Sequence, residues 1–308
     1  MMTKMMGRGL AYWSAHRNGP ASIDIESYEA MLAHPRFEEA CRLVATNMFA
    51  RYRNNRVLAR STKDVTRYFF GWFALYLDAT GGLTLSSIRD LVSNLGIASP
   101  GRAHAILLRL RTLGYVRRDT EQKDRRVRRY VPTADMKEAF LQSSRDDLEA
   151  LALLEPEARQ AASRLDEPEF CAAYIKTVGE GIIGVVKSGG DPTSVFTARD
   201  SGSMILFEIM QSAQPGDAYP PRGPLNCSVT DLAAKYEVSR SHVLKMLRDA
   251  EKEGLLVRNA DQRTCVFSET LRTAVTGLLV TMLAGNALAA HAAIEATAIA
   301  RMPARAMA

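Results

Sequence analysis

Apolar residues recur at helical spacing along much of the chain, and this pattern predicts a mainly helical protein. Residues 34–56 carry one apolar stripe, which predicts an amphipathic helix. Residues 64–77 are apolar or aromatic on all sides, and a helix of this kind is typically buried in the centre of a domain. The side chains of Tyr68, Trp72 and Tyr76 would also suit a small-molecule pocket, but core packing explains them more simply.

The next segment predicts a helix-turn-helix followed by a hairpin. A short helix ends in a turn at Gly96, and a second helix is expected over residues 99–113. Ser99 suits the N-cap of this helix and Pro100 its first turn, where a missing N–H costs nothing. Residues 115–132 are typical of two short strands around a charged tip. Helix, turn, helix and hairpin in this order predict a winged helix-turn-helix domain.

The second half of the chain repeats this order. Helical stretches over residues 169–186 and 201–212 precede a second helix-turn-helix, in which Ser239 caps the second helix and Gly254 ends it. Corresponding motifs lie about 140 residues apart throughout, and an internal duplication explains this more simply than chance does.

The length of 308 residues is enough for two domains of ordinary size, each with a core of its own. We expect an N-terminal arm at residues 1–33, a first winged-helix domain with flanking helices at residues 34–154, and a second one at residues 155–308 that ends in a long helix. The arm carries positive charges but lacks the apolar stretch of a secretory signal.

The charge balance indicates an acidic partner, although a mild basic excess also serves solubility. The net charge of +6 and the pI of about 9.2 favour nucleic acid first and an anionic membrane surface second. Residues 274–294 are uncharged and long enough to span a bilayer, but Asn286, His291 and the many alanines make a membrane span the weaker interpretation and favour a buried helix. The four cysteines show no zinc or disulfide spacing, which favours a reducing cytoplasm.

The second helix of each helix-turn-helix is the candidate DNA reader, because such a helix places its N-terminal residues against base edges in the major groove. Arg can bond guanine bidentately, Ser can bond base edges or phosphate, and Lys can hold either. The second copy has an inward stripe of Val243, Leu244, Leu247 and Ala250. Its outward polar residues are Arg240, Ser241, His242 and Lys245. The comparable residues of the first copy are Arg102, His104, Ala105 and Arg109.

The two hairpins differ in charge. The first concentrates cations suited to phosphates or the minor groove, namely Arg117, Arg118, Lys123, Arg125, Arg126, Arg128 and Arg129. The second has only Arg258 and Arg263. We therefore expect the first copy to supply more of the non-specific affinity, and the second recognition helix to supply more of the sequence readout.

The segments SRSHVLKMLRDAEKEGLLVR, RLRTLGYVRRD and KDRRVRRYVPT resemble the recognition helix, strand and wing of MarR-type winged-helix transcriptional regulators of bacteria, over about 70 residues in each half. The resemblance implies a domain that usually forms a homodimer through helices flanking the winged helix, binds a near-palindromic operator, and responds to a small-molecule effector. By position, it implies DNA contacts for Arg240, Ser241, His242, Lys245 and Arg102, and wing contacts for Arg125 and Arg126.

This chain departs from that pattern because it carries two unequal copies. The helices expected over residues 34–56, 134–153, 169–186 and 270–301 are where such dimers join. We therefore expect a mainly α fold with small β-wings, in which two winged helix-turn-helix domains and their flanking helices pack as an intramolecular pseudo-dimer on an asymmetric site. The sequence leaves open a homodimer through these helices and the identity of any effector.

These observations predict a sequence-specific, double-stranded DNA-binding transcription regulator in the cytoplasm, associated with the nucleoid. Two alternatives stay open: a tandem winged-helix replication initiator, and a protein-docking scaffold, which is usually acidic where this chain is basic. An enzyme is not expected, because the chain has no phosphate-binding Gly-rich loop, no HExxH motif and no nucleophile elbow. No cofactor or metal is expected either, since the five histidines show no ligand spacing.

Overall fold

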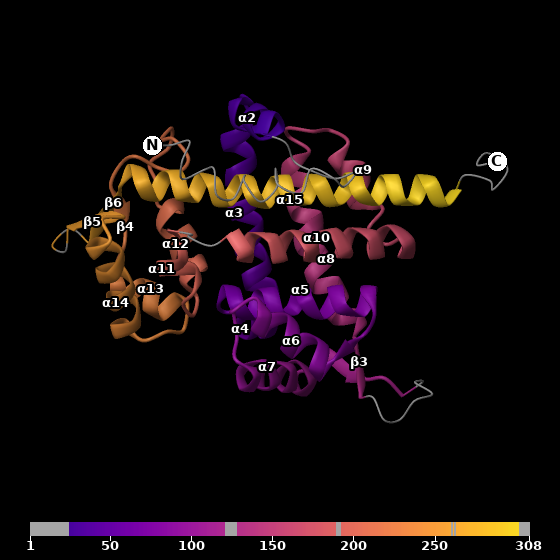
Figure 1. Ribbon diagram of the computed structural model, residues 1–308. Coiled ribbons are helices and arrows are strands. Elements are labelled where there is room, and N and C mark those ends of the chain that lie inside the picture. The colour runs from indigo at the N-terminus through magenta and orange to yellow at the C-terminus, as the bar shows by residue number, and fades with distance from the viewer. Residues whose placement is uncertain (1–24, 121–127, 189–191, 260, 262, 302–308) are drawn as a thin grey trace.

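The protein is mainly helical and carries two small antiparallel sheets, as the sequence pattern predicts. The computed structural model describes residues 25–120, 128–188, 192–259, 261 and 263–301 (Figure 1). The elements of the first half are α2 (Ile25–Ala33), α3 (Phe37–Asn54), α4 (Arg56–Ser61), α5 (Val65–Thr80), β1 (Leu83–Thr84), α6 (Leu85–Asn94), α7 (Pro100–Thr112), β2 (Val116–Arg118), β3 (Arg129–Pro132) and α8 (Ala134–Leu151). Those of the second half are α9 (Ala158–Ser163), α10 (Pro168–Ser188), α11 (Ser194–Thr197), α12 (Gly202–Gln211), β4 (Leu225–Asn226), α13 (Val229–Lys235), α14 (Arg240–Lys252), β5 (Leu256–Asn259), β6 (Thr264–Phe267) and α15 (Glu269–Arg301).

The same order of strand, two helices and hairpin occurs twice. We call residues 83–132 the first unit and residues 225–267 the second unit. Their sheets have the strand orders β1-β3-β2 and β4-β6-β5, with antiparallel pairing throughout. Leu83 lies opposite Tyr130 in the first sheet, and Leu225 lies opposite Cys265 in the second. The two registers therefore correspond, which lets positions in one unit be compared with positions in the other.

The starts and ends of the two long unit helices follow from their capping residues. Ser99 accepts a hydrogen bond from the Arg102 N–H at 3.3 Å at the start of α7, and Ser239 does the same for His242 at 3.1 Å at the start of α14. Both helices end before a glycine in the left-handed region, at φ of +77° and +68°. The predicted helix boundaries are thereby confirmed.

The two halves are interlocked. The helix α10, from the second half, packs along α5 of the first half, and a β-carbon added at Gly179 would lie 2.5 Å from the Tyr76 ring. Conversely, α3 of the first half reaches the second, where the Tyr52 and Tyr236 rings meet edge to face at 5.4 Å. The helices α3 and α10 thus contact both halves, since α3 also packs on α8 and α10 on α15.

The buried side chains of both halves consequently form one contiguous core. We expected a separate core for each half, and this expectation is wrong because α3 and α10 cross between the halves. The aromatic helix α5 lies inside this core: Trp72 is buried and packs edge to face on Phe140, and the Tyr68 ring stacks on the same Phe140. These aromatic residues therefore act in core packing.

The long C-terminal helix α15 runs beside α10 across the molecule and also contacts α8 and α9 (Figure 1). Over Glu269–Ile299 it is long and apolar enough to cross a membrane, by length and composition alone, and half of its most apolar window is buried against the rest of the protein. This burial is what a core helix of a mainly helical protein requires.

The end of the predicted N-terminal arm is helical. Tyr28 and Met31 on α2 are buried, and α2 packs on α3 and α15. Residues 25–33 are therefore part of the packed fold and not of an arm, because Tyr28 and Met31 cover apolar surface; residues 1–24 lie outside the described part of the chain.

Candidate nucleic-acid interface

The helix α14 divides into a buried stripe and an exposed polar face. Val243, Met246, Leu247 and Ala250 are buried. This stripe includes Met246, which the sequence analysis missed, whereas the predicted Leu244 is only half-buried. One face of α14 therefore packs on the second unit, and the opposite face is exposed to solvent.

The first turns of that exposed face carry the predicted cations. Arg240 and Ser241 are exposed, and the Ser241 hydroxyl lies 2.9 Å from that of the N-cap Ser239. Lys245 is 73% exposed, and its Nζ lies 3.2 Å from a carboxylate oxygen of Asp249. Hydrogen bonds from Arg199 and Lys245 hold the pKa of the Asp249 carboxyl below its usual range. Because the Lys245 ammonium stays in solvent, it can exchange this carboxylate for a phosphate at small cost.

Arg248 extends this face by one further turn and is exposed as well. The sequence analysis did not single it out, although its position three residues after Lys245 is the signal that would have found it. Arg240, Ser241, Lys245 and Arg248 therefore form one polar strip along α14.

His242 does not belong to this strip. Its ring Nε2 lies 3.0 Å from the backbone carbonyl oxygen of Asp200, and the side chain is half-buried. We predicted that His242 projects outward with Arg240. It instead connects α14 to the turn before α12, because the first helical turn here rests against that neighbouring segment.

The residue of α7 that corresponds to His242 also has a partner within the protein, although we predicted that it contacts DNA. Arg102 sits at the position equivalent to His242, and its Nη2 lies 3.2 Å from Oδ2 of Asp64, the buried N-cap of α5. Arg67 lies 3.3 Å from the same Asp64 oxygen and 2.9 Å from Oδ1 of Asp200.

These contacts form a continuous chain between the two recognition helices, which we call the inter-helix bridge: Arg102, Asp64, Arg67, Asp200 and His242. A backbone hydrogen bond of 2.8 Å from the Ser201 N–H to the Lys63 carbonyl reinforces it. The bridge ties the N-terminal ends of α7 and α14 to one another. Its members are scattered over the sequence, so no local motif could have predicted it.

The outer face of α7 is less polar than that of α14. His104 and Arg109 are exposed as predicted, but Ala105 stands where α14 has Lys245, and the exposed Leu108 stands where α14 has Arg248. The first unit therefore presents fewer hydrogen-bond donors from its helix.

The first hairpin, in contrast, carries several exposed cations. Arg117 and Arg118 of β2 and Arg128 just before β3 are exposed. Arg129 folds back instead, and its Nη2 donates a hydrogen bond to the Gly81 carbonyl. The predicted wing contacts Arg125 and Arg126 lie outside the described residues.

The second hairpin presents apolar side chains in place of charge. Arg258 is fixed by Glu251 of α14, which accepts from its Nη2 at 3.0 Å and from its backbone N–H at 3.1 Å. These contacts, the backbone hydrogen bond first among them, lower the pKa of the Glu251 carboxyl. Val257 and Val266 face each other across the hairpin and are 70% and 41% exposed. Arg263 remains an exposed cation in the loop between β5 and β6.

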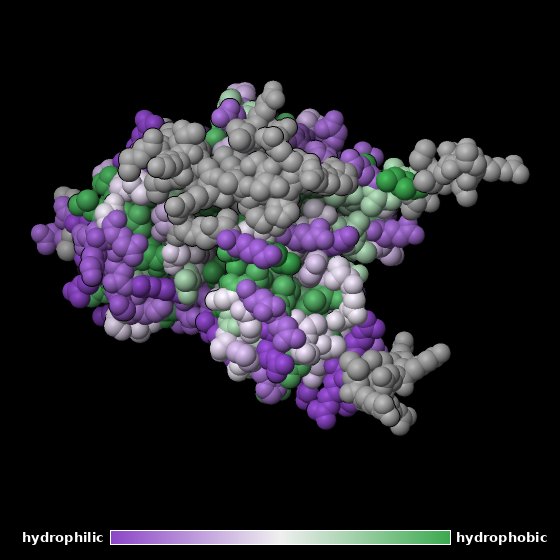
Figure 2. Space-filling model, viewed as in Figure 1, coloured by the Kyte–Doolittle hydropathy of each residue, from purple (hydrophilic) through white to green (hydrophobic). Residues whose placement is uncertain are grey.

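The two units lie apart in the molecule. In Figure 1, α14 lies at the left and α7 at the bottom, with β5 and β6 above α14 and β3 to the right of α7. Figure 2 shows hydrophilic residues gathered over the second unit and beside the base of the first hairpin.

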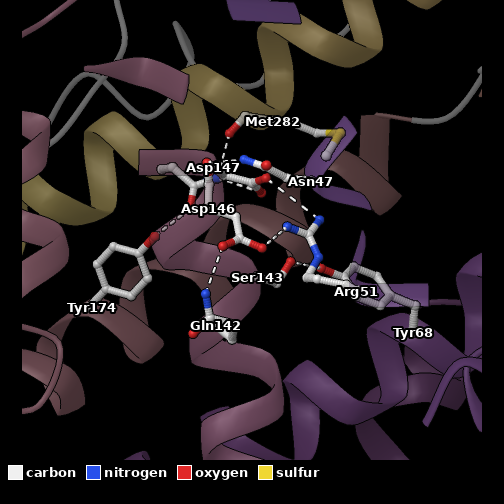
Figure 3. A network of polar contacts seen from close by, with 10 residues as sticks. Asn47, Arg51, Tyr68, Gln142, Ser143, Asp146, Asp147, Tyr174 and Met282 are labelled. Carbon is white, nitrogen blue, oxygen red and sulfur yellow. Dashed lines mark hydrogen bonds and ion pairs between the residues drawn. The ribbon is translucent and has the colours of Figure 1, made fainter. Parts of the chain in front are cut away.

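A buried polar network lies behind this surface, where α3, α8, α10 and α15 meet (Figure 3). Arg51 of α3 is 2.7 Å from Asp146 Oδ2 and 3.8 Å from Asp147 Oδ1. Asn286 of α15 contacts Asp147 Oδ2 at 3.5 Å and accepts a hydrogen bond from the Tyr174 hydroxyl of α10. The network therefore joins the leading and closing helices of both halves.

Within the network, the Asp147 carboxylate is buried, and few contacts offset the cost of removing its charge from water. None of the described residues donates a hydrogen bond to its Oδ1. Burial raises the pKa of Asp147 to about 6, against the opposing charge of Arg51 and with a further contribution from Asp146. The carboxyl consequently changes charge between weakly acidic and neutral solution.

No protein-family model, no curated protein and no solved structure matches this chain significantly. Its own geometry therefore has to carry the functional argument.

Proposed function

We propose that this chain is a double-stranded DNA-binding transcription regulator that reads an asymmetric site with two winged helix-turn-helix units. The observation that carries the proposal is the polar strip on α14, which stands at the start of a Ser-capped helix beside a hairpin, in a unit whose element order occurs twice. The second helix of such a unit is the one that enters a major groove.

The two units contribute differently. Arg240 and Ser241 suit base edges, while Lys245 and Arg248 suit phosphate or guanine. The exposed Arg117 and Arg118 of the first hairpin suit phosphates, whose contacts add affinity without sequence preference.

The interlocked halves support an intramolecular pseudo-dimer, because each leading helix packs on the opposite half and α15 covers both. One chain therefore supplies the two readers that two subunits supply in a homodimeric regulator. The half-sites differ because α7 and α14 carry different side chains, and we expect a DNA site without a strict palindrome. A cytoplasmic location follows from the same proposal.

The test is an affinity selection of sheared DNA from the source genome with purified protein, followed by sequencing. The wild type runs beside Arg240→Ala/Lys245→Ala and beside a matched control, Arg159→Ala/Lys176→Ala, which removes the same charge from exposed positions on α9 and α10. We expect sharp peaks that share a motif, with the motif lost only in the α14 variant.

Three results would contradict the proposal. Diffuse or absent enrichment would indicate a protein-docking scaffold. Peaks that keep their motif in the α14 variant would remove α14 as the reader. Enrichment confined to tandemly repeated sites that open into single strands would indicate a replication initiator.

A further inference from the structure

Two of the cysteines are neighbours in the sheet of the second unit, near the loop of its hairpin. Cys265 on β6 faces Leu225 of β4, and the N–H of Cys227, the residue after β4, donates to the Arg263 carbonyl at 2.9 Å. Cys227 and Cys265 are therefore diagonal neighbours across two strands, and alternate residues of a strand share one face. The register therefore places their side chains side by side on one face of the sheet, and both residues are buried, at 5% and 1% exposure.

The pair is electrostatically unequal. The hydrogen bond from the Cys265 thiol holds the pKa of Cys227 below its ordinary value, with Arg258 adding to the effect and burial and Glu251 opposing it. The same hydrogen bond and burial raise the pKa of Cys265. A thiolate with a second thiol in contact is the arrangement that allows a sulfenic acid to be resolved as a disulfide.

The other two cysteines lack this arrangement. Burial raises the pKa of Cys41 to about 12, and burial also raises the pKa of Cys171. Both lie on helices outside the second unit, Cys41 on α3 and Cys171 on α10. They therefore serve as internal controls for thiol reactivity.

The sheet framework does not require thiols at these positions. In the matching register of the first unit, Leu85 stands at the position of Cys227 and Tyr130 at that of Cys265. Leu85 begins α6 there, and both it and Tyr130 are half-buried, so this place in the first unit holds no thiol. The dithiol is thus a particular property of the second unit.

We propose that Cys227 and Cys265 form a peroxide-oxidisable dithiol that closes into a disulfide between the start of α13 and β6. The Cys227 thiolate attacks one oxygen of hydrogen peroxide, the O–O bond breaks, and hydroxide leaves to be protonated to water. Cys265 then attacks the sulfenic sulfur, the S–O bond breaks, and the proton of Cys265 leaves with the hydroxide as a second water. Peroxide gains the two electrons that the two thiols lose.

The strand arrangement provides the access that this step needs. The strand β4 has two residues and lies at the edge of its sheet, so local opening exposes Cys227 without unfolding the unit. Diagonal neighbours in a sheet have Cα atoms about 7–8 Å apart, which is more than the roughly 4.4–6.8 Å of a disulfide. Closure therefore draws β4 toward β6 and changes the hairpin near its loop.

The test treats the intact protein with hydrogen peroxide, blocks the remaining thiols and maps tryptic peptides without reduction. The expected product links peptide 223–235, which contains Cys227, to peptide 264–272, which contains Cys265. Titratable thiols should fall by two from the four of the reduced chain. The double variant Cys41→Ser/Cys171→Ser should lose the same number, and Cys227→Ser or Cys265→Ser should give no such cross-link.

Several outcomes would overturn the proposal: no linked peptide pair in the wild type, a disulfide between two chains, or oxidation of Cys41 and Cys171 as fast as that of the pair. The peptide map of the wild type decides the question even where a serine variant folds poorly. The chemistry is read on the protein alone, so its failure is distinct from a failure of the DNA-binding proposal.

Discussion

At matching positions of the two hairpins, Arg117 lies opposite Val131 in the first unit, and Val257 lies opposite Val266 in the second. The second helices of the units differ in the opposite sense: α7 has Ala105 and Leu108 where α14 has Lys245 and Arg248. Each unit therefore concentrates its exposed charge on a different element. The same framework can divide phosphate binding and base readout between two copies.

One substitution on the second helix of the unit explains why the hairpins differ in available charge. Glu251 at the end of α14 fixes Arg258, whereas the corresponding residue of α7 is Arg111, which has no carboxylate to offer the corresponding hairpin residue, Arg118. One acidic residue thus removes Arg258 from the cations available on the second hairpin.

The largest effect is expected from the recognition helices. Arg240→Ala should cost about 1–3 kcal/mol on the specific site and change base preference at one half-site, because a bidentate guanine contact is lost. His104→Ala on α7 should cost less than about 0.5 kcal/mol. Titration of labelled duplexes with each variant measures both values. Equal losses of binding free energy in the two variants would contradict the proposed division of roles between α7 and α14.

The second prediction concerns the buried network that the two halves share. The folded-state pKa of Asp147, about 6, exceeds its unfolded value, so the folded state binds a proton that the unfolded state releases. Stability should therefore rise as the pH falls from about 7 to about 5, by roughly 1.3 kcal/mol.

The variant Asp147→Asn supplies the comparison, because it removes this titration and keeps the shape of the side chain. Urea unfolding of both proteins at several pH values gives the two slopes. Carboxyls with lowered pKa values, such as those of Asp249 and Glu251, act only in more acidic solution, where their stabilising contacts are lost. Parallel curves for wild type and variant in the window between about pH 5 and 7 would show that Asp147 does not titrate there.

The third prediction concerns variants in which each hairpin receives side chains typical of the other. Arg117→Val/Arg118→Ala gives the first hairpin the apolar character of the second and should weaken binding to all sequences about tenfold, with a salt slope smaller by about 2. The reciprocal change Val257→Arg should strengthen binding to all sequences. Dissociation constants measured over a range of salt concentrations check both. An unchanged slope in the first variant would exclude phosphate contacts by β2.

The smallest effect on stability is expected from the inter-helix bridge. Arg67→Ala breaks the link between Asp64 and Asp200 and should lower the free energy of unfolding by less than about 1 kcal/mol, since Arg67 is part-exposed. The variant should nevertheless tolerate changes in half-site spacing. When the half-sites are moved one base pair closer together or farther apart, its affinity should change less than that of the wild type.

Binding to a series of spaced sites measures this tolerance. Arg36→Ala is the matched control, because it breaks an exposed ion pair with Glu39 of 2.8 Å at the start of α3, away from the bridge. A spacing preference as sharp in Arg67→Ala as in Arg36→Ala would mean that the bridge does not set the distance between the readers.

Local signals predicted the elements of both units well. Ser99, Ser239 and the glycines after α7 and α14 act within a few residues of themselves, so their effect can be read from the chain. Solvent exposure of Arg240, Lys245 and Arg128 was likewise predictable from helical periodicity and hairpin charge. The side-chain environment of His242 was not, because its partner Asp200 lies in another element.

The sequence by itself determined the mainly helical class, the repeated order of elements and the unequal charge of the two hairpins, since all of these depend on periodicity, capping and composition. Only the tertiary structure decided that α3 and α10 each contact both halves, that Arg102 and His242 join one bridge, and that Cys227 and Cys265 are neighbours in one sheet. The physical reason is that each of these contacts joins residues distant in sequence, and packing of the whole core selects such contacts.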